Sequence, residues 1–163
     1  MADEIDPIEW SRRAWDDNKG PAPDHFAAMS AVFRLEQLVG AALDRALREH
    51  GVSRTGYQIL AALSLEPDQT LAMGQLSKRL LLHPTTVSLI ADKLQARQLL
   101  TRSPSETDRR TTLASLTDEG AHVLSVISES LSEIDYGFEG VSSRMAVTLT
   151  EIIRQVRQDM GDA

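Results

Sequence analysis

Cysteine is absent from the chain and aromatic residues are scarce, and each shortage removes a class of function. Among the 163 residues there is no cysteine, and Phe, Trp and Tyr together make up 4%. Without cysteine the protein cannot form disulfides, use a thiol as nucleophile or redox sensor, or bind zinc through thiolates. The scarcity of aromatics beside abundant Leu and Ala favours a helical domain. We expect a cytoplasmic location, because nothing in the composition requires an oxidising compartment.

Long apolar runs and the common catalytic motifs are missing as well. No stretch of 18 uninterrupted apolar residues occurs, so no membrane span is expected. The acidic start MADEIDPIEW has no apolar segment and does not resemble a signal peptide. The four histidines lack the spacing of a metal motif, and neither a glycine-rich phosphate loop nor a nucleophile elbow is present. We therefore expect no metal, no cofactor and no enzymatic activity.

Positive charge is scarce overall but is concentrated in one segment. The formal net charge of the chain is −7. Residues 72–111 carry seven basic and three acidic side chains, so this segment is +4 and the remainder is −11. A basic island in an acidic protein is typical of a local surface for a polyanion such as nucleic acid, although a solvated helical face would show the same charges.

The N-terminal third of the chain predicts two helices. Residues 7–19 form the first, and the breaker sequence Gly-Pro-Ala-Pro at 20–23 ends it. Asp24 is the expected N-cap of a second helix that ends near His50, with Gly51 as its stop. At 1.5 Å per residue this helix spans roughly 40 Å, which a compact monomer of this size cannot easily cover.

The middle of the chain predicts a helix-turn-helix followed by a hairpin. Ser53 caps one helix, residues 73–81 form a short one, and Pro84 stands at the first position of another. The last of these has one apolar face with helical spacing, made of Val87, Ile90, Ala91 and Leu94. Residues 99–102 and 111–116 predict two strands joined by the polar loop SPSETDRR. Two short helices, a tight turn and a hairpin describe a winged helix.

The C-terminal part predicts two more helices. Thr117 caps the first, which runs to a break at Gly140, and both helices carry apolar residues in steps of three and four. These are Leu124, Ile127, Leu131, Ile134 and Phe138, then Met145, Leu149, Ile152, Val156 and Met160. Such faces suit either an intramolecular antiparallel pair or a dimer interface. A dimer is favoured because the long helix after Asp24 also needs a cover.

A hairpin tip with two adjacent arginines has a physical explanation in DNA binding. In a winged helix the second helix enters the major groove and the wing lies over the minor groove. A narrow minor groove rich in A·T pairs has a strongly negative potential that attracts guanidinium groups. This accounts for Arg109 and Arg110, and Asp108 is placed to orient one of them by a bidentate ion pair.

Two motifs resemble the MarR family of bacterial transcriptional regulators. Asp-Arg-Arg at 108–110 with Leu-Thr-Asp-Glu-Gly at 116–120 is similar to that family's wing signature. LSKRLLLHPTTVSLIADKLQARQLLTR at 76–102 is similar to its helix-turn-helix and first wing strand. The resemblance implies a mainly α fold with a small β-wing, flanked by dimerisation helices. The implied parts are an N-terminal dimerisation segment at 1–50, a winged helix-turn-helix at 51–117 and C-terminal dimerisation helices at 118–163.

The resemblance also implies a function and its residues. Members are homodimers that bind a pseudo-palindromic operator in double-stranded DNA, usually as repressors. By position, residues of the second helix would face the major groove, and Arg110 would enter the minor groove. Leu89 departs from the family, since many members carry a polar residue there. The DNA-binding residues so implied are Thr85, Thr86, Ser88, Leu89, Lys93, Arg102, Asp108, Arg109 and Arg110.

Many members release DNA when a small aromatic or acidic ligand binds between the dimerisation helices and the winged helix. A cysteine switch is impossible here, so ligand sensing or no sensing remains. The N-terminal tryptophans resemble the extra helix of a urate-responsive branch, but Gln58 stands where that branch has an acid. The candidate ligand residues are Trp15, His25, Phe33, Arg34 and Tyr57, each of which also fits ordinary packing.

A winged-helix protein that acts mainly on a protein partner, such as an antirepressor, is the alternative. The arginines at the hairpin tip count against it, because a protein interface needs no minor-groove arginine. DNA binding through several phosphates would weaken steeply with increasing salt concentration. This salt dependence would distinguish a DNA-binding regulator from a protein that acts mainly on a protein partner.

Overall fold

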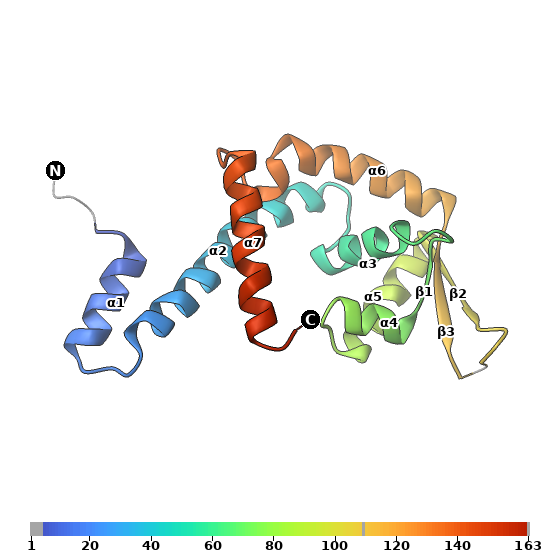
Figure 1. Cartoon of the computed structure of the whole chain (residues 1–163). Coiled ribbons are helices and arrows are strands. Elements are labelled where there is room, and N and C mark those ends of the chain that lie inside the picture. Colours follow the sequence, from blue (N-terminus) through green and yellow to red (C-terminus); the bar gives the residue numbers. More distant parts are fainter. Residues whose placement is uncertain (1–4, 109, 163) are drawn as a thin grey trace. The chain divides into compact units, whose positions relative to one another are not determined.

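The computed structural model describes residues 5–108 and 110–162, and the chain divides into two compact units. The first comprises residues up to Ala41 and the second residues 42–163. Figure 1 gives the element labels used below.

The N-terminal unit contains α1 (Pro7–Asp17) and most of α2 (Pro23–Arg48). The carboxylate of Asp6 caps α1 by accepting from the first-turn N–H groups of Ile8 and Glu9. The turn between the helices is closed by the indole of Trp15. Its ring stacks on that of Phe26 with centroids 4.4 Å apart, and its N–H donates to the Pro21 carbonyl at 2.9 Å.

The prediction of Asp24 as the N-cap of the long helix is wrong. The helix begins at Pro23, and Asp24 lies within its first turn. Proline suits the first helical position because its φ is already helical and its missing N–H has no intrahelical partner there. The Asp24 carboxylate then lies near the positive end of the helix dipole.

The second unit has the winged-helix order of elements. After the end of α2 come α3 (Arg54–Ser64), β1 (Thr70–Ala72), α4 (Met73–Arg79), α5 (Pro84–Ala96), β2 (Leu100–Pro104) and β3 (Thr112–Leu116). The strands form an antiparallel sheet in the order β1-β3-β2, and β2 and β3 make the hairpin that extends from it in Figure 1. Then follow α6 (Asp118–Glu133), a 3-10 turn at Asp135–Gly137 and α7 (Ser143–Asp159).

One apolar core holds the elements of the winged helix together. It contains fully buried leucines and isoleucines of α3, α4 and α6 and the base of β2, among them Ile59, Leu60, Leu63, Leu76, Leu100, Ile127 and Leu131. From α5 it takes Val87, Ala91 and Leu94, so the predicted apolar face of that helix is confirmed. Because this face is buried, the opposite side of α5 is left facing solvent.

The predicted caps of this unit are confirmed. Ser53 Oγ accepts from Gly56 N at 3.1 Å, and Thr117 Oγ1 accepts from Gly120 N at 2.9 Å. Gly120 is required by close packing, because a Cβ there would meet the Leu99 carbonyl oxygen at 1.9 Å. The start of α6 therefore packs directly against the backbone at the base of β2.

Two predictions about element extent need correction. The sequence reading missed β1, a three-residue strand whose pairing with β3 is a tertiary contact. It also ran the helix after Thr117 to Gly140, whereas α6 ends at Glu133. Residues Asp135, Tyr136 and Gly137 all have positive φ, so the chain turns while its apolar spacing continues. Hydrophobic periodicity does not register a turn made by non-glycine residues in the left-handed region.

The helices outside the winged helix carry exposed apolar side chains. None of the residues of α7 is buried, and Met145, Ile152, Val156 and Met160 are at least half exposed. On α2, Val32, Phe33 and Leu38 are similarly exposed. By length and composition α2 could also cross a membrane, since its most apolar 18-residue window has a mean hydropathy of 1.3. A single helix of this kind near the N-terminus is weak evidence of a membrane span, because helices of soluble proteins meet the same criterion.

Candidate nucleic-acid interface

The outward face of α5 presents small polar groups near the start of the helix. Thr85, Thr86 and Ser88 are exposed there, and Leu89 beside them is 54% exposed. The helix is opened by His83, whose Nδ1 accepts from Thr85 N at 3.3 Å. Hydroxyl groups can donate to or accept from base edges, and an exposed leucine can contact a thymine methyl. The predicted major-groove residues are thus brought together on one accessible surface.

The loop of the hairpin is organised by Asp108. Its carboxylate accepts from Arg110 N at 3.0 Å and from Thr111 Oγ1 at 2.9 Å, and its carbonyl accepts from Thr111 N at 2.9 Å. The backbone donor from Arg110 and then the Thr111 hydroxyl hold the pKa of the Asp108 carboxyl below its ordinary value. Asp108 therefore shapes the loop backbone that carries Arg110.

The side chain of Arg110 is exposed and has no hydrogen-bond or ion-pair partner among residues 5–108 and 110–162. The ion pair predicted for Asp108 is therefore not made with the Arg110 guanidinium. Arg109, the other arginine of the pair, lies outside the described residues. A free guanidinium in the hairpin loop is available to an external anion.

The basic island divides into paired and unpaired side chains. Arg79 forms an ion pair with Glu66, Arg97 donates to backbone carbonyls, and Arg102 is bound by Asp92 and Gln95. Within the described part of the chain, Lys78, Lys93 and Arg110 have no such partner. The charges free to meet a polyanion are thus fewer than the sequence count indicated.

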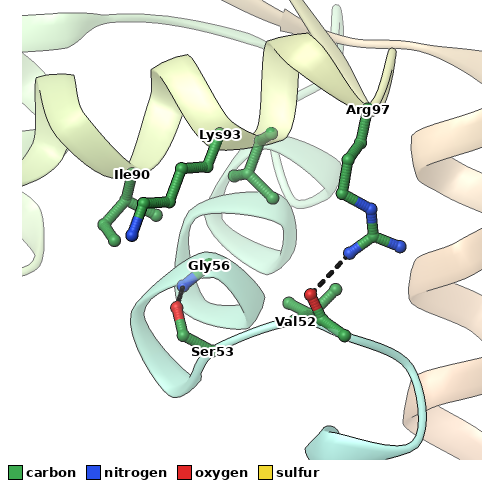
Figure 2. Close-up of a pocket in the computed structure, with 8 residues that line it drawn as sticks. Val52, Ser53, Gly56, Ile90, Lys93 and Arg97 are labelled. Carbon is green, nitrogen blue, oxygen red and sulfur yellow. Dashed lines mark hydrogen bonds between the residues drawn. The ribbon is translucent and has the colours of Figure 1, made fainter.

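A pocket of about 220 Å³ lies between α5 and the turn that leads into α3. Figure 2 shows Lys93 and Arg97 reaching from α5 toward that turn, with Ile90 and Val52 beside them. Arg97 Nη1 donates to the Gly51 carbonyl at 2.6 Å and Nη2 to the His50 carbonyl at 3.1 Å. Since these carbonyls follow the C-terminus of α2, Arg97 ties the end of α5 to the end of α2.

The predicted ligand residues are divided between the two units. In the first, Trp15 is engaged with Phe26 and Pro21, and His25, Phe33 and Arg34 are exposed. In the second, Tyr57 packs against the core, and burial raises the pKa of its hydroxyl despite a hydrogen bond with Ser128. Their use by a ligand stays a prediction.

Sequence reasoning overlooked the residues that hold the interface in place. Asp92 and Gln95 on α5 bind Arg102, and Arg97 binds the α2–α3 turn. One feature of the sequence could have revealed this role: Asp92 is an acid on the polar side of a helix that is expected to approach DNA phosphates. No three His, Asp or Glu side chains of the described residues come together as a metal site would require.

Comparisons with known proteins agree with this geometry. A family model described as the MarR family matches residues 50–111. The transcriptional regulator MhqR of Bacillus subtilis (strain 168) is 28% identical over 132 residues, covering 80% of this chain and 88% of MhqR. The transcriptional regulator SarZ of Staphylococcus aureus (strain USA300) is 30% identical over 111 residues, covering 68% of this chain and 71% of SarZ.

A solved structure shows the same fold. Sco3205, a MarR family transcriptional regulator from Streptomyces coelicolor solved in complex with DNA, superposes with a TM-score of 0.74 at 25% identity. The match covers 82% of this chain and 88% of that one. The family match includes the helix-turn-helix and the hairpin up to Thr111. The chain belongs to the MarR family of winged helix-turn-helix transcriptional regulators, which bind DNA and are not enzymes.

Proposed function

We propose that this protein is a homodimeric repressor that binds a pseudo-palindromic operator through two winged helices. The observation that carries the proposal is that an exposed polar face on α5 occurs together with an Arg110 side chain that has no partner among the described residues of the wing. In this arrangement Thr85, Thr86, Ser88 and Leu89 face the major groove. Lys93 contacts phosphate, and Arg110 enters the minor groove.

Dimerisation is supported by the apolar side chains that a single chain leaves exposed. Met145, Ile152 and Val156 share one side of α7, and none of them is buried. Exposed apolar faces of this kind are buried by association in stable dimers. A second copy of this chain is the proposed occupant, and a two-fold dimer explains why the operator would be palindromic.

Release by a small aromatic or acidic ligand is the remaining element of the proposal. It is supported by family membership and by the aromatic residues at the N-terminal turn. It is also supported by the link from Arg97 to the end of α2, because a ligand that moves α2 would move α5 with it. The absence of cysteine excludes a thiol switch in its place.

Fluorescence anisotropy with DNA from the region upstream of the protein's own gene tests the proposal, with a scrambled duplex as control. We expect tight binding that prefers the upstream duplex and weakens steeply between two salt concentrations. Candidate aromatic acids are then added to the complex, and release indicates ligand control. Equal, weak binding to both duplexes would count against an autoregulatory operator, and a duplex library selected with the protein would then locate another.

A further inference from the structure

We propose that Arg102 is a positioning residue, which fixes the angle between the wing and α5 instead of serving as a phosphate contact. The proposal rests on the DNA-binding function of the family and concerns how the two DNA-reading elements are held together. It reassigns a residue that the sequence placed in the DNA-binding set.

Arg102 joins the hairpin stem to the exposed side of α5. From β2, its Nη2 forms an ion pair with Asp92 Oδ1, and its Nε donates to Gln95 Oε1 at 2.7 Å. Asp92 and Gln95 are three residues apart, so their side chains are neighbours on the helix surface. A guanidinium donates from two nitrogens in a fixed plane and can bridge two such acceptors, which a lysine ammonium on its flexible stem does less well.

The exposure of these side chains fits a structural link. The Arg102 side chain is 25% exposed and the Asp92 side chain 58%. The pairing neutralises Asp92, the acid on α5 that would otherwise repel DNA phosphate. If Arg102 left this position to bind a phosphate, the Asp92 carboxylate would remain unpaired on the DNA-facing helix.

The link lies where it controls the direction of the wing. Arg102 stands opposite Ala114 in the strand register, two residues before β2 ends at Pro104. On one side of it the stem is fixed by buried Leu99 and Leu100, and on the other the hairpin continues to the loop with Arg110. Because α5 and the wing address different grooves, a change in their angle misplaces Arg110 when α5 is correctly seated.

Two variants separate this role from a direct phosphate contact. Arg102→Lys keeps the charge but loses the two-acceptor bridge, and Asp92→Ala removes the helix side of the link. Arg157→Lys is the matched control, because Arg157 on α7 forms a comparable pair, at 2.6 Å, with Asp162 beyond the end of that helix. Affinity is measured for a duplex selected from a random library by the wild-type protein and for its scrambled counterpart.

If Arg102 has a positioning role, Arg102→Lys weakens binding to the selected duplex roughly three- to tenfold and leaves the affinity for scrambled DNA nearly unchanged. A loss of this size is in the range of coupling energies between contacting residues. Asp92→Ala also lowers the ratio of affinity for the selected duplex to affinity for the scrambled one. The double variant lowers this ratio little more than either single variant does. Hydrogen exchange of the β2 and β3 amides rises in Arg102→Lys, while the melting temperature stays near that of the wild type.

The opposite results overturn the proposal. If Arg102 is a phosphate contact, lysine replaces it at full affinity, and Asp92→Ala tightens binding to both duplexes by removing a negative charge. A drop in affinity for both duplexes with an unchanged ratio would likewise contradict it. If the wild type selects no duplex at all, the proposal that this chain binds specific DNA is wrong. That result differs from one in which the wild type selects a duplex but the variants show no positioning role for Arg102.

Discussion

The winged helix and the helices that flank it expose opposite kinds of surface. On α5 and the wing, most apolar residues pack into the core and hydroxyl and cationic groups face outward, with Leu89 as the exposed large apolar exception on α5. On α7 most of the apolar residues are exposed, and none is buried. The difference indicates two kinds of partner: a polyanion for the first surface and an apolar protein face for the second.

Charge divides the molecule along similar lines. The segment 72–111 is +4 and the remainder −11, so the acidic parts repel DNA and favour approach through the basic island. Within that island, three arginines are held by internal partners. We therefore expect a salt dependence governed by the few free cations of the described residues, mainly Lys78, Lys93 and Arg110.

The largest effect is expected when the exposed apolar face of α7 is made charged. Ile152→Asp with Val156→Asp puts two charges on the exposed face of α7 and should convert a dimer to monomers, measured by sedimentation. Operator affinity should then fall by about 100-fold or more, because two half-sites are no longer bound by one linked molecule. Arg154→Asp, roughly on the opposite side of the helix, is the control and should leave the dimer intact. A monomeric wild type would contradict the dimer proposal.

The next largest effect concerns the tip of the wing. Arg110→Ala should cost about 1–3 kcal/mol of DNA binding and reduce the preference for a narrow minor groove. Titrations on duplexes with and without an A·T run at the wing position measure both quantities. Arg13→Ala on α1 serves as the arginine control. Unchanged affinity in Arg110→Ala would refute the minor-groove assignment.

A smaller effect is expected at Leu89, the exposed apolar residue on the face of α5 that we propose reads DNA. If it contacts a thymine methyl, deoxyuridine at that position should weaken wild-type binding by about 1 kcal/mol, at the lower end of the cost of one altered base pair. Leu89→Ala should bind the thymine and uracil duplexes equally. A wild type that does not distinguish them would show that Leu89 reads no methyl group.

The smallest effect is expected at Asp108. Asp108→Ala removes both carboxylate contacts of the wing loop and should weaken DNA binding a few-fold, whereas Asp108→Asn keeps one acceptor and should lose less. Titration of the Asp108 carboxyl by NMR tests the cause of its lowered pKa: Thr111→Val removes one donor and should raise it.

The pH dependence of this loop follows from the direction of that shift. Folding of the loop lowers the pKa of the Asp108 carboxyl. The contribution of the ionised carboxylate to loop order is therefore fully present above the ordinary carboxyl pKa. It is lost only as the pH falls through the lowered one. Loop order should therefore be constant around neutrality, and loss of order between pH 6 and 8 would contradict this account.

Much of the fold was predictable because local rules govern it. Ser53 and Thr117 are caps, Pro84 opens α5, and the buried face of α5 follows the helical period of its apolar residues. The extent of α6 was not predictable, since the turn at Asp135–Gly137 is made by residues with no breaker chemistry except the final glycine. The short β1 exists through its pairing with β3 and has no local signature.

The sequence alone determined the class of the protein: a basic helix-turn-helix and an arginine-tipped hairpin within an acidic helical chain. Local spacing and charge are written in the order of residues, so these features needed no coordinates. Only the tertiary structure decided which charges are free. Arg102 and Arg110 look alike in the sequence, yet one is bound by Asp92 and Gln95 across the fold while the other is exposed. Pairing depends on side chains far apart along the chain, and packing brings those together.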